Sequence, residues 1–310
     1  MGLLETFIGL ILESGKSAVN LAIYILLPVM VVMMALMHTL EEKGVLTRVA
    51  LFFAPILDVF GIPGIGVFAI LQILLVSFGA PVATFHIMAK DETFSDRQIA
   101  ATFAATIVMS QANAVFPLGA VGLNLPVVYV SSIIGGITAA LITRFFYKKS
   151  NDYKPSPVSK KSQKMILSLL FEGGEMGLHV VYKSLPALVL AILLVNVLKK
   201  LSVLKIIERI TEPVFSFIGV NSVAVIPVIT KFLAGGTAMM AVTIDLIEKG
   251  LMTSKDLNML AGFMINPIDP VGIMVFLSVG LRFQQVLKPV LIASLVGIFI
   301  RGIIHIVYFY

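Results

Sequence analysis

The sequence predicts an all-α, polytopic membrane protein made of two inverted-topology repeats. Three observations carry this prediction: the composition, the length of the apolar runs, and a pattern of prolines and glycines that occurs twice. The chain has 310 residues, of which 58% are hydrophobic and 13% charged, and its mean hydropathy is +1.03. About a quarter of the residues of a soluble domain are charged, so the composition excludes an ordinary soluble protein.

Long apolar runs predict the membrane-spanning helices. A spanning helix needs roughly 20 apolar residues. Met1 to Lys16 lacks the basic start and the small-residue cleavage site of a secretory signal, so no cleaved signal is expected. We expect a multi-pass protein of the cell (inner) membrane. The apolar runs lie near residues 21–40, 65–90, 99–116, 124–147, 184–198, 222–247, 257–281 and 286–310.

Several chemistries are disfavoured by what the sequence lacks. Without cysteine, disulfides and thiolate metal sites are excluded. His179 shares a helical face with Glu172 and Glu175, but a solvated face is the simpler interpretation of that group. No metallohydrolase, phosphate-binding or nucleophile motif is present, so no enzyme activity, metal or cofactor is expected. The net charge of +6 gathers in loops, which indicates membrane topology and not nucleic-acid binding.

The first half is predicted to be a series of helices. Leu3 to Ser17 is short and two-faced, so we expect it in the membrane interface, and a spanning helix follows from about Val19 to Leu40. Residues 45–60, interrupted by Pro55, are too short to cross. The next apolar run breaks at Ser77 to Pro81, which predicts either a kinked span or the tip of a re-entrant hairpin.

The same punctuation returns after a polar linker. A repeat in a membrane protein, with broken helices at corresponding positions, is typical of internally symmetric transporters. We expect a first repeat over 1–147, a basic cytoplasmic linker over 148–164 and a second repeat over 165–310. The matched residues are 158 positions apart: Pro28 with Pro186, Pro55 with Pro213, and Gly61 with Gly219.

Charge bears on the topology of the two repeats. Val203 to Phe217 carries too many charged side chains for hydrocarbon, so we expect this element in the interface in both halves. If runs 65–90 and 222–247 are hairpins, each half has three full crossings, and the second half must be inverted. The basic linker would then be cytoplasmic, in line with the positive-inside rule. Whether the two runs are hairpins or full spans, and which side the termini face, stays open.

Polar clusters interrupt the apolar helices at two corresponding places. Prolines beside both clusters remove a backbone donor and push the preceding residue out of helical angles. Unwound backbone at membrane depth is buried in protein or lines a wet cavity. We therefore predict one central polar site built from Ser110, Gln111 and Asn113 in the first half and Asn266 and Asp269 in the second.

Asp269 is the strongest single candidate, because an ionisable side chain within a span is costly unless it is paired or functional. Lys231 is the expected counter-charge, although its side chain could equally reach the interface. The amides of the clusters suit a nucleobase, a sugar or an amide-like solute, and equally suit hydrogen bonds between helices. Gly235, Gly236 and Thr237 either let the backbone approach an anionic group or pack helices closely.

A set of residues in the second half, mostly glycines and prolines, resembles the nucleoside-recognition, or gate, domain. It comprises Glu172 to His179, then Leu185-Pro186, Pro213, Gly219 and Gly235-Gly236. That domain occurs in spore-maturation membrane proteins and in the gate regions of ferrous-iron transporters, and concentrative nucleoside transporters share its element order. The resemblance covers nearly the whole chain, with one gate domain per half. It implies a substrate held between two hairpin tips and two unwound helices, which adds Ser77 and Gly79 to the site.

Two functions of different classes stay open. The first is a secondary transporter that moves a small polar solute, nucleoside-like or another small organic molecule, coupled to protons through Asp269 or to sodium through unwound carbonyl groups. The second is a non-transporting, gate-like scaffold whose polar centre only packs the two halves. A divalent-cation gate is weakened by the shortage of central carboxylates. Expected partners are membrane lipid, the solute and a coupling ion, and a homo-oligomer is compatible with the sequence.

Overall fold

The computed structural model describes residues 3–147, 163–201 and 203–310, and in these ranges the chain is helical, without β-strands. The predicted linker 148–164 lies almost wholly outside the described residues. Among the described helices, five are long and apolar enough to cross a membrane, which confirms the predicted all-α fold of a polytopic membrane protein. They span Phe7–Glu42, Asp96–Ala120, Leu125–Phe146, Ile166–Leu198 and Leu287–Phe309.

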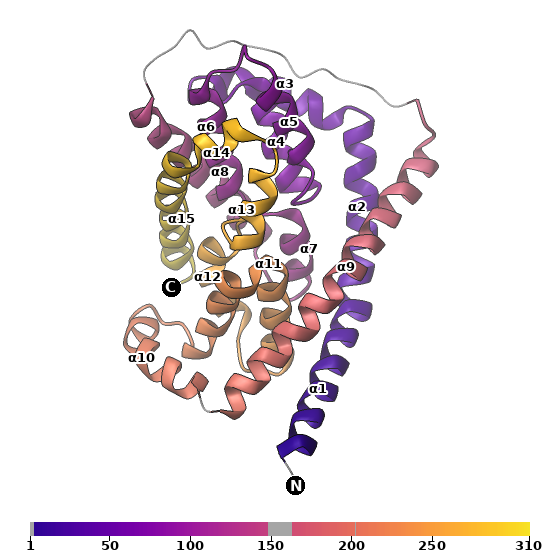
Figure 1. Ribbon diagram of the computed structural model, residues 1–310, viewed down its shortest axis with the longest axis vertical. Helices are drawn as coiled ribbons and strands as arrows, with labels where there is room; N and C mark the ends of the chain where they lie inside the picture. The colour runs from indigo at the N-terminus through magenta and orange to yellow at the C-terminus, as the bar shows by residue number, and fades with distance from the viewer. Residues whose placement is uncertain (1–2, 148–162, 202) are drawn as a thin grey trace.

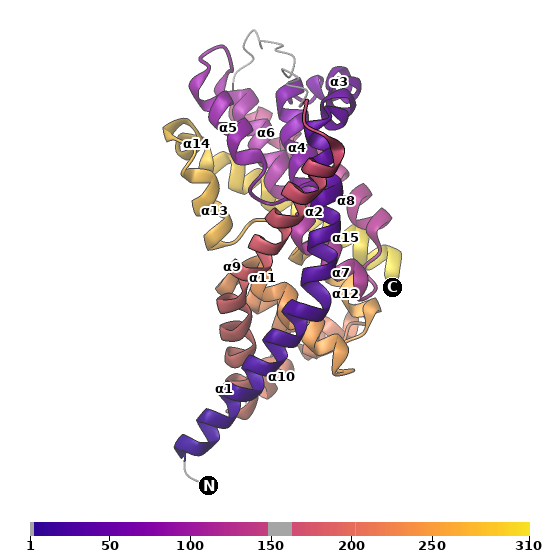
Figure 2. The ribbon, with the colours of Figure 1, turned by 90° about the vertical axis from the view of Figure 1, so that its right-hand side faces the viewer.

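The first long helix is continuous where the sequence predicts two elements (Figures 1 and 2). Helix α1 (Leu3–Asn20) passes through a π-helical turn, η1 (Leu21–Leu26), into α2 (Leu27–Glu42). The expected separate interfacial helix over Leu3 to Ser17 is therefore the start of this long helix. Pro28 stands in the first turn of α2, and the π-helical turn before it accommodates the missing donor.

Helix α9 (Ile166–Lys200) is likewise unbroken across Pro186 and crosses α2. Glycines allow this close crossing. A Cβ atom on Gly173 would lie 2.7 Å from Ala35 Cα, and one on Gly177 would lie 2.6 Å from the Met30 carbonyl oxygen. The two long helices form a pair along one side of the molecule (Figure 1).

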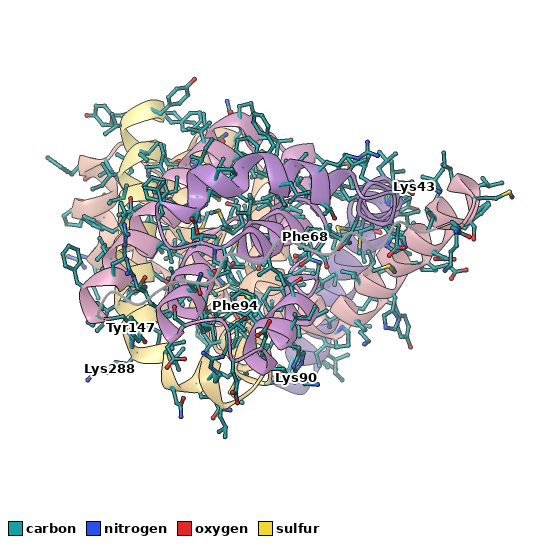
Figure 3. The ribbon with its side chains drawn as sticks, turned by 90° about the horizontal axis from the view of Figure 1, so that it is seen from above. Lys43, Phe68, Lys90, Phe94, Tyr147 and Lys288 are labelled. Atoms are coloured by element: carbon teal, nitrogen blue, oxygen red, sulfur yellow. The ribbon has the colours of Figure 1, made fainter. Side chains whose placement is uncertain are left out.

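Two short amphipathic helices lie at opposite ends of the molecule. Figure 1 shows α3 (Val45–Asp58) at the upper end and α10 (Val203–Phe217) at the lower end. Figure 3 looks onto the α3 end, where Lys43, Lys90 and Lys288 are labelled. The two amphipathic helices are thus separated by the length of the molecule, and Lys43, Lys90 and Lys288 lie at the α3 end.

Each half contains a helical hairpin. Helix α4 (Gly64–Leu75) packs against α5 (Pro81–Lys90), and at 12 residues α4 is only about 18 Å long, shorter than the hydrocarbon core of a bilayer. Helix α11 (Val225–Glu248) is interrupted at Gly235, with φ 88° and ψ 178°. Its two ends meet, because Asn221 before it bonds the carbonyl oxygen of Leu251 after it at 3.4 Å. Both apolar runs are therefore hairpins in this structure.

A broken helix follows each hairpin. In the first half, α6 (Asp96–Val108) and α7 (Ala112–Ala120) flank an unwound stretch; in the second, α12 (Ser254–Met264) and α13 (Pro270–Leu277) do. Capping boxes at Ser95 and Thr253 start α6 and α12 in the same way. The remaining elements are α8 (Leu125–Thr143), η2 (Arg144–Phe146), η3 (Ser222–Ala224), α14 (Leu281–Gln285) and α15 (Leu287–Phe309).

Aromatic packing holds the first hairpin against the second broken helix. Phe276 of α13 makes edge contacts with Phe78, Phe85 and Phe103 at ring-centroid distances of 5.3, 5.6 and 5.8 Å. Such edge-on aromatic pairs each contribute about 0.5–1.5 kcal/mol beyond their burial. The tip of the first hairpin is thereby fixed beside the second half of the chain.

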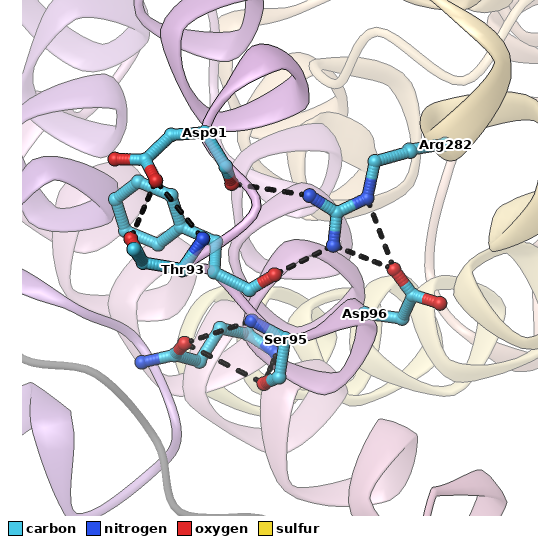
Figure 4. Close-up of polar contacts among 7 residues, drawn as sticks. Asp91, Thr93, Ser95, Asp96 and Arg282 are labelled. Carbon is cyan, nitrogen blue, oxygen red and sulfur yellow. Dashed lines mark hydrogen bonds and ion pairs between the residues drawn. The ribbon is translucent and has the colours of Figure 1, made fainter.

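A polar cluster joins the two halves at the α3 end (Figure 4). Arg282 of α14 donates to the Asp96 carboxylate at 2.8 Å and to the carbonyl oxygens of Asp91 and Phe94 at 3.2 and 2.6 Å. The Thr93 hydroxyl and the Thr93 backbone N–H both donate hydrogen bonds to the Asp91 carboxylate. They lower the pKa of this carboxyl, and the hydroxyl has the larger effect. Arg282 thus ties the second half to the loop between α5 and α6.

Candidate solute site

The hairpin tips and the helix breaks meet around two adjoining cavities of about 160 and 360 Å³. Phe78, Asn113 and Thr237 line both cavities. The other residues of the smaller cavity are Gln111, Ala234, Gly235, Gly236, Asp269 and Gly272. Those of the larger cavity are Leu26, Met30, Ser77, Gly79, Val180, Val181, Lys183 and Met240.

The first half brings its hairpin tip and its helix break together directly. The Asn113 side-chain oxygen accepts a hydrogen bond from the Phe78 backbone N–H at 3.1 Å. Ser77 and Gly79, beside Phe78, face the larger cavity, while Gln111 precedes α7 and faces the smaller one. The structure therefore places these predicted residues of the first half around one space.

The second half is joined by a buried ion pair. Lys231 of the hairpin pairs with Oδ2 of Asp269, and their side chains are 0% and 5% exposed. Oδ1 of Asp269 accepts a hydrogen bond from the Gly272 N–H at 2.8 Å and so caps α13. Lys231 does not reach towards an interface, because its charge is used to neutralise Asp269.

Two glycines lie where the second hairpin tip meets the helix breaks. A Cβ atom on Gly236 would lie 2.3 Å from Nε2 of Gln111, and one on Gly235 would lie 3.4 Å from Oδ1 of Asp269. Gly235 also has a positive φ of 88°, which other residues rarely adopt. The absence of side chains here lets the second hairpin tip close over both helix breaks.

Two of the predicted site residues serve the backbone and do not line either cavity. Ser110 donates its hydroxyl to the Ile265 carbonyl oxygen at 3.2 Å and accepts a hydrogen bond from Ser132 at 2.9 Å. Asn266 donates to the Phe263 carbonyl oxygen at 2.7 Å and accepts from the Ile268 N–H at 3.0 Å. These bonds satisfy backbone groups that unwinding leaves without helical partners.

Other polar groups at the cavities have no partner within the described part of the chain. They are the side-chain amide of Gln111, the amide nitrogen of Asn113 and the hydroxyl of Thr237. None of these atoms is among the fully buried side-chain atoms that lack a partner, so they are accessible to water from the cavities. A solute entering the cavity would therefore find both donors and acceptors ready to exchange water for its own groups.

Compared with protein families, curated sequences and solved structures, the chain matches only the solved structures. No protein-family model matches the sequence, and no curated protein sequence matches it either. A doubly substituted form of CNTnw in an outward-facing state matches with a TM-score of 0.68 at 11% identity, over 97% of this chain and 83% of that chain. The fold is similar to that of CNTnw. CNTnw in an inward-facing substrate-bound state matches with a TM-score of 0.65 at 12% identity, over 91% of this chain and 74% of that chain.

CNTnw is a concentrative nucleoside transporter, so the expected likeness in fold to that class is found. At this identity the likeness concerns the fold and carries no residue roles. Within the described residues no group of three or more histidine, aspartate or glutamate side chains could hold a metal. Glu172, considered above beside Glu175 and His179, pairs with Lys164 at 2.8 Å.

Sequence reasoning missed two basic residues, one buried between the helix breaks and one exposed at the larger cavity. Arg301 is fully buried among the two helix breaks, and Lys183 lines the larger cavity. A signal for Arg301 was present, because it is an ionisable residue inside the apolar run 286–310. Lys183 carries no such signal, since it stands at the start of an apolar run, where lysine is common.

Proposed function

We propose that the chain is a secondary transporter of the cell (inner) membrane that moves a small polar solute, nucleoside-like or of similar size, through the central site. The unpaired polar groups of Gln111, Asn113 and Thr237 around the cavities carry this proposal. A scaffold with a self-satisfied centre would pair those groups with protein. The similarity in fold to CNTnw, a transporter with a substrate-bound state, supports it.

The two cavities fit a solute with apolar faces and polar edges. The larger, at about 360 Å³, is within the roughly 300–1,000 Å³ of small-molecule sites. Its wall combines apolar side chains such as Met30 and Met240 with the polar groups of Asn113 and Thr237. A nucleoside or a similar organic molecule can place its ring face against the apolar side chains and its hydrogen-bonding edges against the polar groups.

The site is made by both proposed repeats, 1–147 and 165–310. The first contributes the Asn113–Phe78 contact and the second the Lys231–Asp269 pair. Transport by this arrangement would move one part of the molecule against the rest around the site, driven by a proton or sodium gradient.

Thermal unfolding in detergent against a panel of nucleosides, nucleobases, amino acids and small organic anions tests the proposal. A ligand at 100 times its dissociation constant adds about 2.7 kcal/mol to the stability of the folded state. We expect one solute class to raise the unfolding temperature, and Gln111→Leu to remove most of that rise. Gln285→Leu is the matched control, because the same change falls on an exposed side chain away from the cavities.

Uptake into proteoliposomes then separates transport from binding. The stabilising solute should accumulate in response to a proton or sodium gradient in the wild type and much less in Gln111→Leu. A solute that binds but never crosses would favour the scaffold, as would a panel in which nothing binds. A rise in unfolding temperature with divalent metals alone would favour the cation gate.

A further inference from the structure

Arg301 lies where the two unwound segments cross. The final carbonyl groups of α6 and α12 lack helical partners at their breaks. From α15, Arg301 donates Nη1 to the carbonyl oxygens of Val108 and Ile265, the latter at 3.1 Å, and Nη2 to the Ser110 hydroxyl at 2.5 Å. One guanidinium therefore bridges the break of the first half and the break of the second.

The charge of this guanidinium is balanced by backbone. Arg301 is 0% exposed and has no carboxylate partner within the described residues. A helix C-terminus carries roughly half a negative charge, so the ends of α6 and α12 together match about one positive charge. Unwound carbonyls and the C-terminal ends of half-helices are also the groups with which secondary transporters coordinate sodium.

The surrounding helices are shaped for this side chain. A Cβ atom on Gly135 of α8 would lie 2.5 Å from Arg301 Cγ. A Cβ atom on Gly262 of α12 would lie 2.5 Å from the Arg301 carbonyl oxygen. Two neighbouring helices therefore leave out side chains so that α15 and the arginine stem can approach, which indicates a built position and not a stray buried charge.

We infer that Arg301 is a positioning residue that acts as a built-in cation, holding the two helix breaks together in a place where a bound metal cation would otherwise be needed. The inference deepens the proposed function, because the same breaks carry Gln111 and Asp269 to the cavity. A coupling cation therefore binds elsewhere than at this crossing.

Chemical rescue of Arg301→Ala tests the inference. Thermal unfolding is measured in detergent without solute, at constant ionic strength, with guanidinium, sodium or urea at equal millimolar concentration. We expect the variant to lose roughly 10 °C, guanidinium to restore most of the loss, sodium a smaller part, and urea none, because urea has a similar shape without the charge. Arg282→Ala is the control and should show no rescue.

A cysteine reporter adds a readout of site geometry. The chain has no cysteine, so Thr237→Cys gives a single thiol at the cavity for maleimide labelling. Its labelling rate should rise several-fold when Arg301→Ala is added and fall again with guanidinium. A change that only weakened the fold would raise labelling without selective reversal by the cation.

Arg301→Lys and Arg301→Met complete the test. Lysine keeps the charge, so that variant should fold with a smaller loss than methionine, which removes it. Rescue by urea equal to that by guanidinium, no rescue at all, or a methionine variant equal to the wild type would overturn the inference. Failure of Arg301→Lys to fold would do so too. Because no solute is present, a failed transport assay leaves these results unaffected.

Discussion

Replacing Asp269 by asparagine should strongly destabilise the protein, because the change leaves Lys231 charged and buried without its partner. The two side chains are 5% and 0% exposed, and removing one partner of a buried ion pair costs about 3–5 kcal/mol. The cap on Gly272 should survive, since asparagine is also a good N-cap residue. The unfolding temperature should fall by roughly 6–20 °C, taking about 2–4 °C for each kcal/mol.

A double-mutant cycle in detergent isolates the pair. Adding Lys231→Met to Asp269→Asn should recover much of the loss, because a neutral pair leaves no buried charge unpaired. Asp245→Asn is the matched control: its partner Lys249 is 38% exposed, and such a pair contributes about 0–1 kcal/mol. A fall for Asp269→Asn no larger than that for Asp245→Asn would refute the reasoning.

Three further predictions concern the backbone at Gly235, the contacts of Arg282 and the cavity. Gly235→Ala should cost about 1–3 kcal/mol in denaturant unfolding, whereas Gly79→Ala, whose added Cβ would meet nothing within 4 Å, should cost little; equal losses would contradict this. Arg282→Ala should cost about 1–2 kcal/mol and speed amide exchange in the α5–α6 loop, unlike the exposed Arg48→Ala. Asn113→Asp keeps the acceptor for Phe78 but replaces the amide donor by a carboxylate, so the affinity for the solute should fall roughly tenfold; unchanged affinity would remove Asn113 from the site.

The breaks in the fold could be predicted from the sequence because proline and glycine act locally. Pro267 and Pro270 stand close together and each disfavours helical angles in the residue before it, so the break at Asn266 to Asp269 could be predicted locally, whereas the single Pro186 leaves α9 unbroken. The first long helix was different. Whether Leu3 to Ser17 lies apart or continues into α2 depends on its packing against α9, and tertiary contacts of that kind leave no local trace.

The same limit applies to the site. Ser110 and Gln111 are neighbours in the sequence and both polar, yet one bonds the backbone and the other faces the cavity. The directions of the two side chains are set by the conformation of the unwound backbone between α6 and α7. Residue type alone does not determine that conformation. Arg301 binds groups near position 110 that lie about 190 positions away in the chain, so its role appears only once α15 is placed beside both breaks.

The way the polar groups are used constrains the solute. Among the described residues, Asp269 is the only ionisable one that lines the smaller cavity, and Lys231 already neutralises it. A cation that paired with Asp269 would leave Lys231 buried without a partner. An anion that paired with Lys231 would leave Asp269 buried without a partner, and either change costs about 3–5 kcal/mol. A neutral solute meets no such cost and can bond the amides of Gln111 and Asn113. The smaller cavity therefore favours uncharged polar solutes, and any charged group of the solute would lie in the larger cavity, beside Lys183.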